Sequence, residues 1–338
     1  MPDSPLPVPP PFGEVRAVAP GVLWLRLPLP FALDHVNVWL LEDGDGWTVV
    51  DAGLGGEHTK ALWREVFRGA LGGRPVRRVI ASHFHPDHIG LAGWLVEAFD
   101  AEFLCTRLEW LLAQWLSIAP HERSWPVQEA FYTAAGVPAD KVASIGARGN
   151  LFARSVSPIP QRFTAIADGD VLRIGGREWR VMTGGGHAPE HASLHCPELG
   201  LLIAQDQVLP RISPNVAVWA NEPAGDPLCA FLAALDRFGG LPETTLVLPG
   251  HDAPFATLRQ RTAALARHHA DRLAEVAEDC REPRTAMDVT LALFRRPLDD
   301  HQLIFAVGEA LAHLNRLIRA GEIAAEPGAD GITRYRRR

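Results

Sequence analysis

Apolar and polar residues follow two different periods along the first three quarters of the chain, and the two periods alternate. Short apolar or alternating runs predict β-strands, and the turn EDGDG at 42–46 predicts a hairpin. Strands are expected within 21–30, 35–55, 76–83, 102–106, 163–187, 191–196, 199–206 and 244–251. Apolar residues at helical spacing predict helices at 59–71, 89–99 and 226–238. Strands that alternate with helices are typical of a layered α/β architecture.

Two segments depart from this alternation. Residues 106–145 have helical periodicity, are rich in Trp and Phe, and contain Pro120, Pro126 and Pro138, which we expect to break the helices. We interpret them as a helical insert over the core. From residue 255 onward the pattern predicts a long charged helix, two further helices and a terminal β-hairpin, which is typical of a winged-helix-like module. We therefore expect a catalytic domain at 1–254 and a C-terminal helical domain at 255–338.

Composition narrows the classes of protein that remain. The 338 residues are 47% hydrophobic and carry a formal net charge of −7, which suits a globular protein and argues against nucleic acid as the main partner. No apolar run is long enough to span a membrane. The first residues, MPDSPLPVPPPFGEV, lack the basic and apolar regions of a signal peptide, so a cytoplasmic location is expected. Four scattered cysteines predict buried free thiols rather than a thiolate zinc site or disulfides.

The stretch ASHFHPDHIG, residues 81–90, carries the densest chemistry in the chain. It follows a predicted strand and places His83, His85, Asp87 and His88 within six positions. In an extended segment His83 and His85 leave on the same side, and Asp87 and His88 follow the turn at Pro86. Three imidazoles and a carboxylate that converge without a cation would leave unpaired polar groups, whereas zinc accepts both ligand types. The stretch therefore predicts a metal site.

At this point the chain resembles the metallo-β-lactamase superfamily. HFHPDH resembles the HxHxDH signature of that family, and four other motifs follow the family's order. They are TVVDAGLG with Asp51, TGGGHAPEH with His187, LLIAQDQV with Asp206 and LVLPGHD with His251. The resemblance spans residues 48–252. It implies an αββα sandwich whose site lies at one edge, where loops from both halves meet.

The resemblance also implies a role for each residue. His83, His85 and His187 would hold a first divalent metal ion, and Asp87, His88 and His251 a second. Asp206 would bridge the two ions together with a hydroxide, and Asp51 would orient the ligand loop. Zinc is the first choice of metal, and iron and manganese remain alternatives. His191 is not a ligand in the family's pattern, although contact with substrate is left open.

Three positions depart from the family's pattern without removing a ligand. Glu190, Gln205 and Asp252 stand where glycine is common, so each can tighten the pocket or add a polar contact.

The metal site implies a hydrolase, in which a hydroxide held by two ions attacks an electrophile and Asp87 relays a proton. We expect a small acyl substrate, namely an ester, thioester or lactone as in glyoxalase II and lactonase relatives, because the aromatic insert suits an apolar group. A phosphodiesterase or ribonuclease-like activity is the alternative, because the C-terminal module resembles a domain of some nucleic-acid hydrolases. The expected recognition helix of this module carries only two basic residues, Arg316 and Arg319, which is few for phosphate binding. A β-lactamase ranks behind both, and a non-catalytic scaffold behind that. A homodimer through the C-terminal module is left open.

Overall fold

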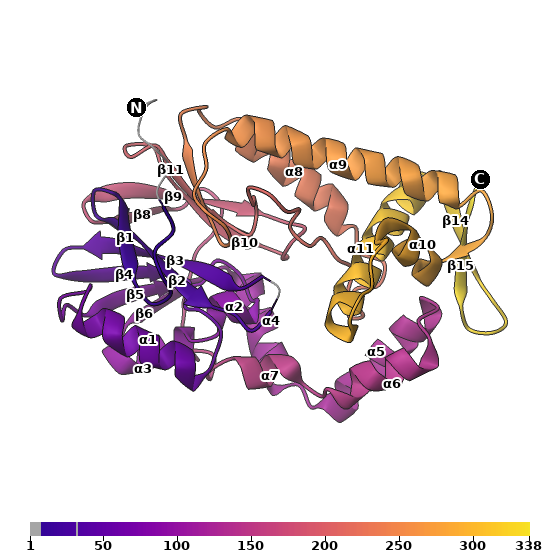
Figure 1. Cartoon of the computed structure of the whole chain (residues 1–338), viewed down its shortest axis with the longest axis horizontal. Helices are drawn as coiled ribbons and strands as arrows, with labels where there is room; N and C mark the ends of the chain where they lie inside the picture. The colour runs from indigo at the N-terminus through magenta and orange to yellow at the C-terminus, as the bar shows by residue number, and fades with distance from the viewer. Residues whose placement is uncertain (1–7, 32) are drawn as a thin grey trace.

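Two β-sheets face each other and helices cover their outer faces, which confirms the expected αββα sandwich (Figure 1). This computed structural model describes residues 8–31 and 33–338, so the first seven residues of the Pro-rich lead-in lie outside the described residues. The core between the sheets combines side chains of both, including Trp24 and Trp39 of one sheet and Trp179 of the other. Trp24 and Trp39 stack with ring centroids 5.8 Å apart.

The first sheet begins antiparallel and becomes parallel. Within the described residues its order is β1 (Val15–Ala19), β2 (Val22–Pro28), β3 (His35–Asp43), β4 (Gly46–Val50), β5 (Val76–Ile80), β6 (Glu102–Cys105) and β7 (Thr164–Ala165). The strands β3 and β4 form the predicted hairpin. Helices α1 (Glu57–Arg68) and α3 (Ala92–Phe99) connect parallel strands and pack on the outer face, where Trp63 and Leu95 are buried. The parallel strands β4 and β5 therefore end at the same edge.

The second sheet has the order β12 (Leu246–Pro249), β11 (Leu201–Gln205), β10 (His191–Cys196), β9 (Arg177–Gly184) and β8 (Val171–Ile174) among the described residues. Its outer face is covered by α8 (Pro227–Gly239) and α9 (Leu258–Asp279), seen at the top of Figure 1. Phe231 and Phe238 of α8 are fully buried against this face. The parallel strands β11 and β12 also end at one edge, which brings the segments that follow them close together.

The helical insert is present as α4 (Arg107–Ile118), α5 (His121–Ala134), α6 (Ala139–Ala147) and α7 (Leu151–Ser155). The prediction that Pro126 breaks a helix is wrong, because α5 continues through it. The missing N–H leaves only the carbonyl of Glu122 without its helical partner, and that residue is exposed to water. Tyr132 of α5 and Val142 of α6 share a hydrophobic core with the C-terminal helices.

The C-terminal segment contains the predicted helices, α9, α10 (Ala286–Leu293) and α11 (Asp300–Arg319). A small sheet follows the order β13 (Arg284–Thr285), β15 (Thr333–Arg337) and β14 (Ile323–Pro327), with β14 and β15 paired antiparallel. The winged-helix-like assignment and the domain boundary at residue 254 stay predictions. α9 packs against both parts, since Leu265 lies in the core under the second sheet and Val276 in the C-terminal core.

Two expectations concern the whole chain. Among residues 8–31 and 33–338, no helix combines the length and the apolar character that crossing a bilayer requires. Cys105, Cys196 and Cys280 are buried free thiols as expected, but Cys229 is exposed. Cys229 lies in the first turn of α8, on the side of the helix that faces away from the sheet.

Candidate metal centre

The histidine cluster lies at the edge where β5 ends. The chain leaves β5 at Ile80 and then forms the short helix α2 (Pro86–Ile89), with His85 as its N-cap residue and Pro86 at its first position. Proline suits this position because its fixed φ is already helical and its missing N–H would be unpaired anyway. The turn reverses the chain between His85 and His88, and the backbone N–H of Ala52 donates to the His88 carbonyl at 2.7 Å. All four ligand-type residues of this stretch thus belong to one rigid turn.

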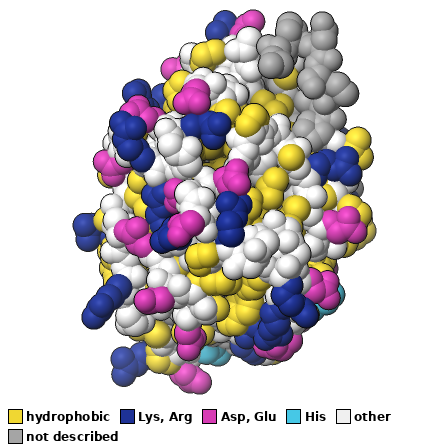
Figure 2. All heavy atoms as spheres, turned by 90° about the vertical axis from the view of Figure 1, so that its left-hand side faces the viewer, with side chains coloured by type: hydrophobic (Ala, Val, Ile, Leu, Met, Phe, Trp, Pro, Cys, Tyr) yellow, Lys and Arg dark blue, Asp and Glu magenta, His cyan; other side chains and the backbone are white. Residues whose placement is uncertain are grey.

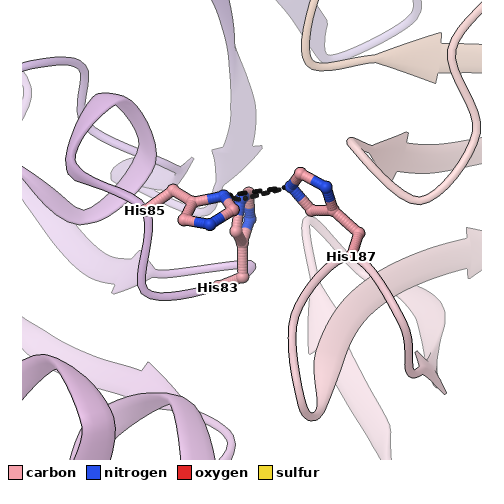
Figure 3. Close-up of side chains that lie close together, drawn as sticks. All are labelled: His83, His85 and His187. Atoms are coloured by element: carbon pink, nitrogen blue, oxygen red, sulfur yellow. Dashed lines mark hydrogen bonds between the residues drawn. The ribbon is translucent and has the colours of Figure 1, made fainter. Parts of the chain in front are cut away.

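Three of the predicted ligands meet at a single point (Figure 3). The atoms His83 Nε2 and His85 Nδ1 lie 2.9 Å apart, and His187 Nε2 lies 3.0 Å from the latter and 3.2 Å from the former. His83 and His85 come from the loop after β5, whereas His187 comes from the loop after β9, so both sheets contribute. Nitrogens bound to one tetrahedral zinc ion lie about 3.3 Å apart, given Zn–N distances of about 2.0–2.1 Å. The three histidines therefore fit one ion.

The carboxylate of Asp206, which follows β11, lies between this group and the remaining predicted ligands. Its Oδ2 atom is 3.5 Å from His187 Nε2, 3.4 Å from His88 Nε2 and 3.3 Å from His251 Nε2. The Asp87 Oδ2 atom is 3.6 Å from His88 Nε2 and 3.5 Å from His251 Nε2. The ligand atoms thus form three groups that could each hold a metal ion, and the middle group shares one histidine with each of the others: His83, His85 and His187; His83, His88 and Asp206; Asp87, His88 and His251.

Two buried atoms in this cluster have no hydrogen-bond partner among the described residues, namely His88 Nε2 and Asp206 Oδ1. A buried polar atom without a partner costs about 1–3 kcal/mol, so the cluster is unfavourable unless a further group completes it. Divalent cations are such a group, because they accept both imidazole nitrogen and carboxylate oxygen. The donor set and the unpaired atoms both fit bound metal ions.

Burial and neighbouring charges set the protonation states of the ligands. Although burial opposes it, Asp206 raises the pKa of His88 and His251, so these two rings have to release a proton when a metal ion binds. Burial lowers the pKa of His83, His85 and His187, which keeps these imidazoles neutral and able to donate a lone pair. Burial opposes ionisation of Asp206, but His251 and His88 hold its pKa well below its usual range. Asp206 is therefore a carboxylate at neutral pH.

The other ring nitrogens are fixed by hydrogen bonds. His187 Nδ1 lies 2.9 Å from the Asn215 carbonyl oxygen, and His251 Nδ1 lies 2.6 Å from the His35 carbonyl oxygen. His83 Nδ1 is 2.9 Å from Ser82 Oγ. With Nδ1 engaged in this way, each ring presents Nε2 to the cluster.

Asp51 supports the ligand loop, as the resemblance implied. One carboxylate oxygen accepts the backbone N–H of Ser82 at 2.7 Å, and the other lies 2.6 Å from His88 Nδ1. The Gln205 amide also donates to Asp51 at 2.5 Å. Asp51 acts through His88: it holds the Nδ1 side of the ring, so that the Nε2 atom of His88 faces the carboxylate of Asp206.

The departures from the family's pattern now have physical consequences. Gln205 and Asp252 both have positive φ, 43° and 66°, a conformation that glycine adopts without strain. Gln205 offsets this strain through its bond to Asp51 and by accepting the Trp39 indole N–H at 3.2 Å. Glycine is kept where space demands it: a Cβ at Gly250 would lie 2.1 Å from Asp206 Oδ1.

Sequence reasoning missed Glu109, the third residue of α4. Its buried carboxylate accepts the backbone N–H of Phe84 at 2.9 Å and that of Glu190 at 2.6 Å. Phe84 lies between two ligand histidines and Glu190 lies near His187, so Glu109 joins the ligand loops of the two sheets. A single acidic residue in the first turn of an ordinary amphipathic helix gave no signal, because its partners are backbone amides distant in sequence.

His191 is fully buried at the start of β10, and its ring centroid lies 4.8 Å from that of His83. Neither ring nitrogen has a hydrogen-bond partner among the described residues. Burial lowers its pKa to about 3, so the ring is neutral. Since the side chain has no exposed surface, the structure gives no support for direct contact with substrate, which was left open.

Comparison with protein families and solved structures agrees with this geometry. The sequence profile of the metallo-beta-lactamase superfamily matches residues 32–251, and that of the metallo-beta-lactamase-like C-terminal domain matches residues 273–338. The first match contains every predicted ligand. The second covers all of α11 and the terminal hairpin.

Solved structures and curated relatives give the same assignment. A beta-lactamase domain protein from Burkholderia ambifaria is 41% identical, with a TM-score of 0.92 over 98% of this chain and 96% of that chain. A metallo-beta-lactamase family protein from Thermus thermophilus is 31% identical, with a TM-score of 0.80 over 95% of this chain and 100% of that chain. A hydroxyacylglutathione hydrolase from Cereibacter sphaeroides is 27% identical over 152 residues, and the match spans 43% of this chain but only 56% of that enzyme. The chain belongs to the metallo-beta-lactamase superfamily and is a hydrolase of that group.

Proposed function

We propose that the protein hydrolyses a small acyl substrate, an ester, thioester or lactone, with two divalent metal ions at the cluster. The observation that carries the proposal is the position of Asp206, whose Oδ2 atom lies within 3.5 Å of His88, His187 and His251. A carboxylate shared in this way suits a pair of ions. His83, His85 and His187 would hold one ion, and Asp87, His88 and His251 the other, with zinc as the first choice.

Bound ions would lower the pKa of a water molecule and polarise the substrate carbonyl. The chain's own residues have distinct tasks in this proposal. Asp206 is held as a carboxylate by the neighbouring histidines. Asp87 is the partly exposed acid of the site, with 21% of its side chain accessible, and is placed to accept a proton and release it to the leaving group. Asp51 keeps His88 in its tautomer and orientation.

The arrangement of the charged side chains favours a small substrate over nucleic acid. Arg316 and Arg319, the two arginines of the expected recognition helix, both lie within 4 Å of the Asp226 carboxylate, and Arg319 also donates to the Ala224 carbonyl. Acidic and basic side chains are interspersed on the face drawn in Figure 2 and form no large patch of one sign. Proteins contact the phosphates of nucleic acids through basic side chains that are free to bind them. Arg316 and Arg319 are already paired with Asp226.

The similarity to a hydroxyacylglutathione hydrolase supports an acyl compound as the substrate. The name of that enzyme describes hydrolysis of a hydroxyacyl thioester of glutathione, and 152 residues of this chain align with it. The cytoplasmic location and the homodimer remain predictions.

A substrate panel tests the proposal. Metal-reconstituted protein should hydrolyse thioesters, nitrophenyl esters or lactones, and the Asp206→Asn variant should lose that activity. A β-lactam and a model RNA belong in the same panel. Cleavage of RNA or of the β-lactam without any acyl hydrolysis would overturn the proposal.

A further inference from the structure

Solvent reaches the metal centre at two of its ligand-type residues. His85 and Asp87 are partly exposed, whereas the other five ligand-type side chains are buried: His83, His88, His187, Asp206 and His251. A substrate therefore arrives past His85 and Asp87, and the elements beside these residues contact the part of the substrate that is not being cleaved.

An aromatic wall is formed by Phe31, Trp219, His301 and Phe305. Phe31 lies in the loop that leads into β3, and the carbonyl of His35, the first residue of β3, lies 2.6 Å from the Nδ1 atom of the ligand His251. His301, in the first turn of α11, stacks on Phe31 with ring centroids 5.2 Å apart and meets Phe305 edge-on at 5.0 Å. Trp219 meets Phe305 edge-on at 5.7 Å. Burial and Arg148 lower the pKa of His301, and Asp299 and Asp87 oppose this shift. By contrast, two tryptophans of the insert pack locally: Trp110 on Phe163 and Trp125 on His121.

Beside the wall lies an arginine without an acidic partner. Arg148 follows α6, and its Nη2 atom lies 3.4 Å from His301 Nδ1. Its Nη1 atom is buried and has no hydrogen-bond partner in the described part of the chain. No carboxylate of the described residues forms an ion pair with Arg148, because the neighbouring Asp300 binds Lys141 at 2.9 Å and Ser144 instead.

A half-buried guanidinium with an unused donor is suited to a carboxylate, which it binds through two parallel hydrogen bonds. The flanking aromatic rings exclude water and so strengthen such a contact. The insert supplies the charge, α11 supplies His301 and Phe305, and the preceding part of the chain supplies Phe31 and Trp219.

We propose that Arg148 and the aromatic wall bind a carboxylate on the acyl part of the substrate, so that the substrate is a carboxylate-bearing ester or thioester. This inference rests on the proposed acyl hydrolysis. In that reaction, water oxygen bonds to the acyl carbon, the carbon–sulfur or carbon–oxygen bond breaks, and the leaving group takes a proton. Arg148 takes no part in these bond changes and acts on substrate binding.

Two thioesters of N-acetylcysteamine provide the test, since the glutaryl thioester ends in a carboxylate and its glutaramoyl counterpart in a neutral amide. Arg148→Gln is compared with Arg123→Gln, an exposed arginine of α5 that makes no side-chain hydrogen bond among the described residues. We expect the unchanged protein and R123Q to prefer the carboxylate in kcat/KM by about 10–100-fold, the value of one charged hydrogen-bonded contact. R148Q should lose this preference through a higher KM for the carboxylate thioester. R148K should keep part of the preference, which separates loss of charge from loss of folding.

Titration calorimetry on chelator-treated protein gives a readout that needs no catalysis, with glutarate and glutaramide as probes. Glutarate should bind the unchanged protein and R123Q more tightly than R148Q. Equal hydrolysis of both thioesters, or a preference that survives in R148Q, would overturn this inference and leave the proposed acyl hydrolysis standing. If no acyl substrate is cleaved, the proposed function fails, and the titration alone decides whether Arg148 binds a carboxylate.

Discussion

Replacing Glu109 tests whether the ligand loops of the two sheets are held together by one buried carboxylate. Glu109→Ala removes the acceptor of two backbone amides, those of Phe84 and Glu190. Each orphaned amide costs about 1–3 kcal/mol, which gives about 2–6 kcal/mol in total. Burial raises the pKa of Glu109 to about 7, so the variant also regains about 3 kcal/mol by no longer burying an acid. The net effect on stability is therefore small, between a gain of about 1 kcal/mol and a loss of about 3 kcal/mol.

Metal affinity is the sharper measure of this variant. The two loops that carry His83, His85 and His187 lose their common anchor, and loss of such supporting contacts typically lowers metal affinity about 10–100-fold. Glu109→Gln keeps one acceptor oxygen and should lose less. Affinity is measured by competition with a chromogenic chelator, and the free energy of unfolding by urea titration of metal-free protein. Glu122→Ala, at an exposed position of the insert, is the matched control. An E109A variant that binds zinc within twofold of the unchanged protein would refute the reasoning.

Three further changes follow from the same geometry. Gly250→Ala places a Cβ about 2.1 Å from Asp206 Oδ1, so we expect loss of the second metal ion in elemental analysis, and a variant that keeps two ions contradicts this. Asp51→Asn turns an acceptor of the His88 Nδ1 proton into an amide, so metal affinity should fall about 10–100-fold in chelator competition; an unchanged affinity would show that Asp51 is dispensable. Burial lowers the pKa of His313 to about 4 in the folded protein, whereas the same side chain in the unfolded chain has the ordinary pKa of 6.5. Below pH 6.5 the unfolded chain therefore binds a proton that the folded protein does not, and the folded protein loses stability. The unfolding free energy of the unchanged protein should drop by about 2 kcal/mol more than that of His313→Gln between pH 8 and pH 5, and parallel urea midpoints in the two proteins would contradict it.

Much of the sandwich could be predicted because its strands and helices have clear periods. The run 76–80 is buried in the sheet and leads directly into the histidine cluster, as expected from its apolar pattern. Strand β1 at 15–19 was missed, since it lies at the edge of the sheet and none of its residues is fully buried. Pro126 misled the prediction of the insert, because a surface helix tolerates one unpaired carbonyl.

Candidate ligands could be predicted because they lie in short motifs of characteristic residue types. His83, His85, His187 and Asp206 meet in the structure although about a hundred residues separate the first two from the others. Contacts that depend on tertiary packing left no such mark. Glu109 binds backbone amides distant in sequence, and Arg148 lies beside His301 because α6 packs against the C-terminal core.

The central claim is that two divalent ions share the carboxylate of Asp206, and a crystal structure of zinc-grown protein with anomalous scattering at the zinc edge tests it most directly. The account predicts two peaks, one beside the nitrogens of His83, His85 and His187 and one beside Asp87, His88 and His251, each about 2.0–2.2 Å from its ligand atoms. A map with no peak at this cluster in zinc-replete protein would contradict it.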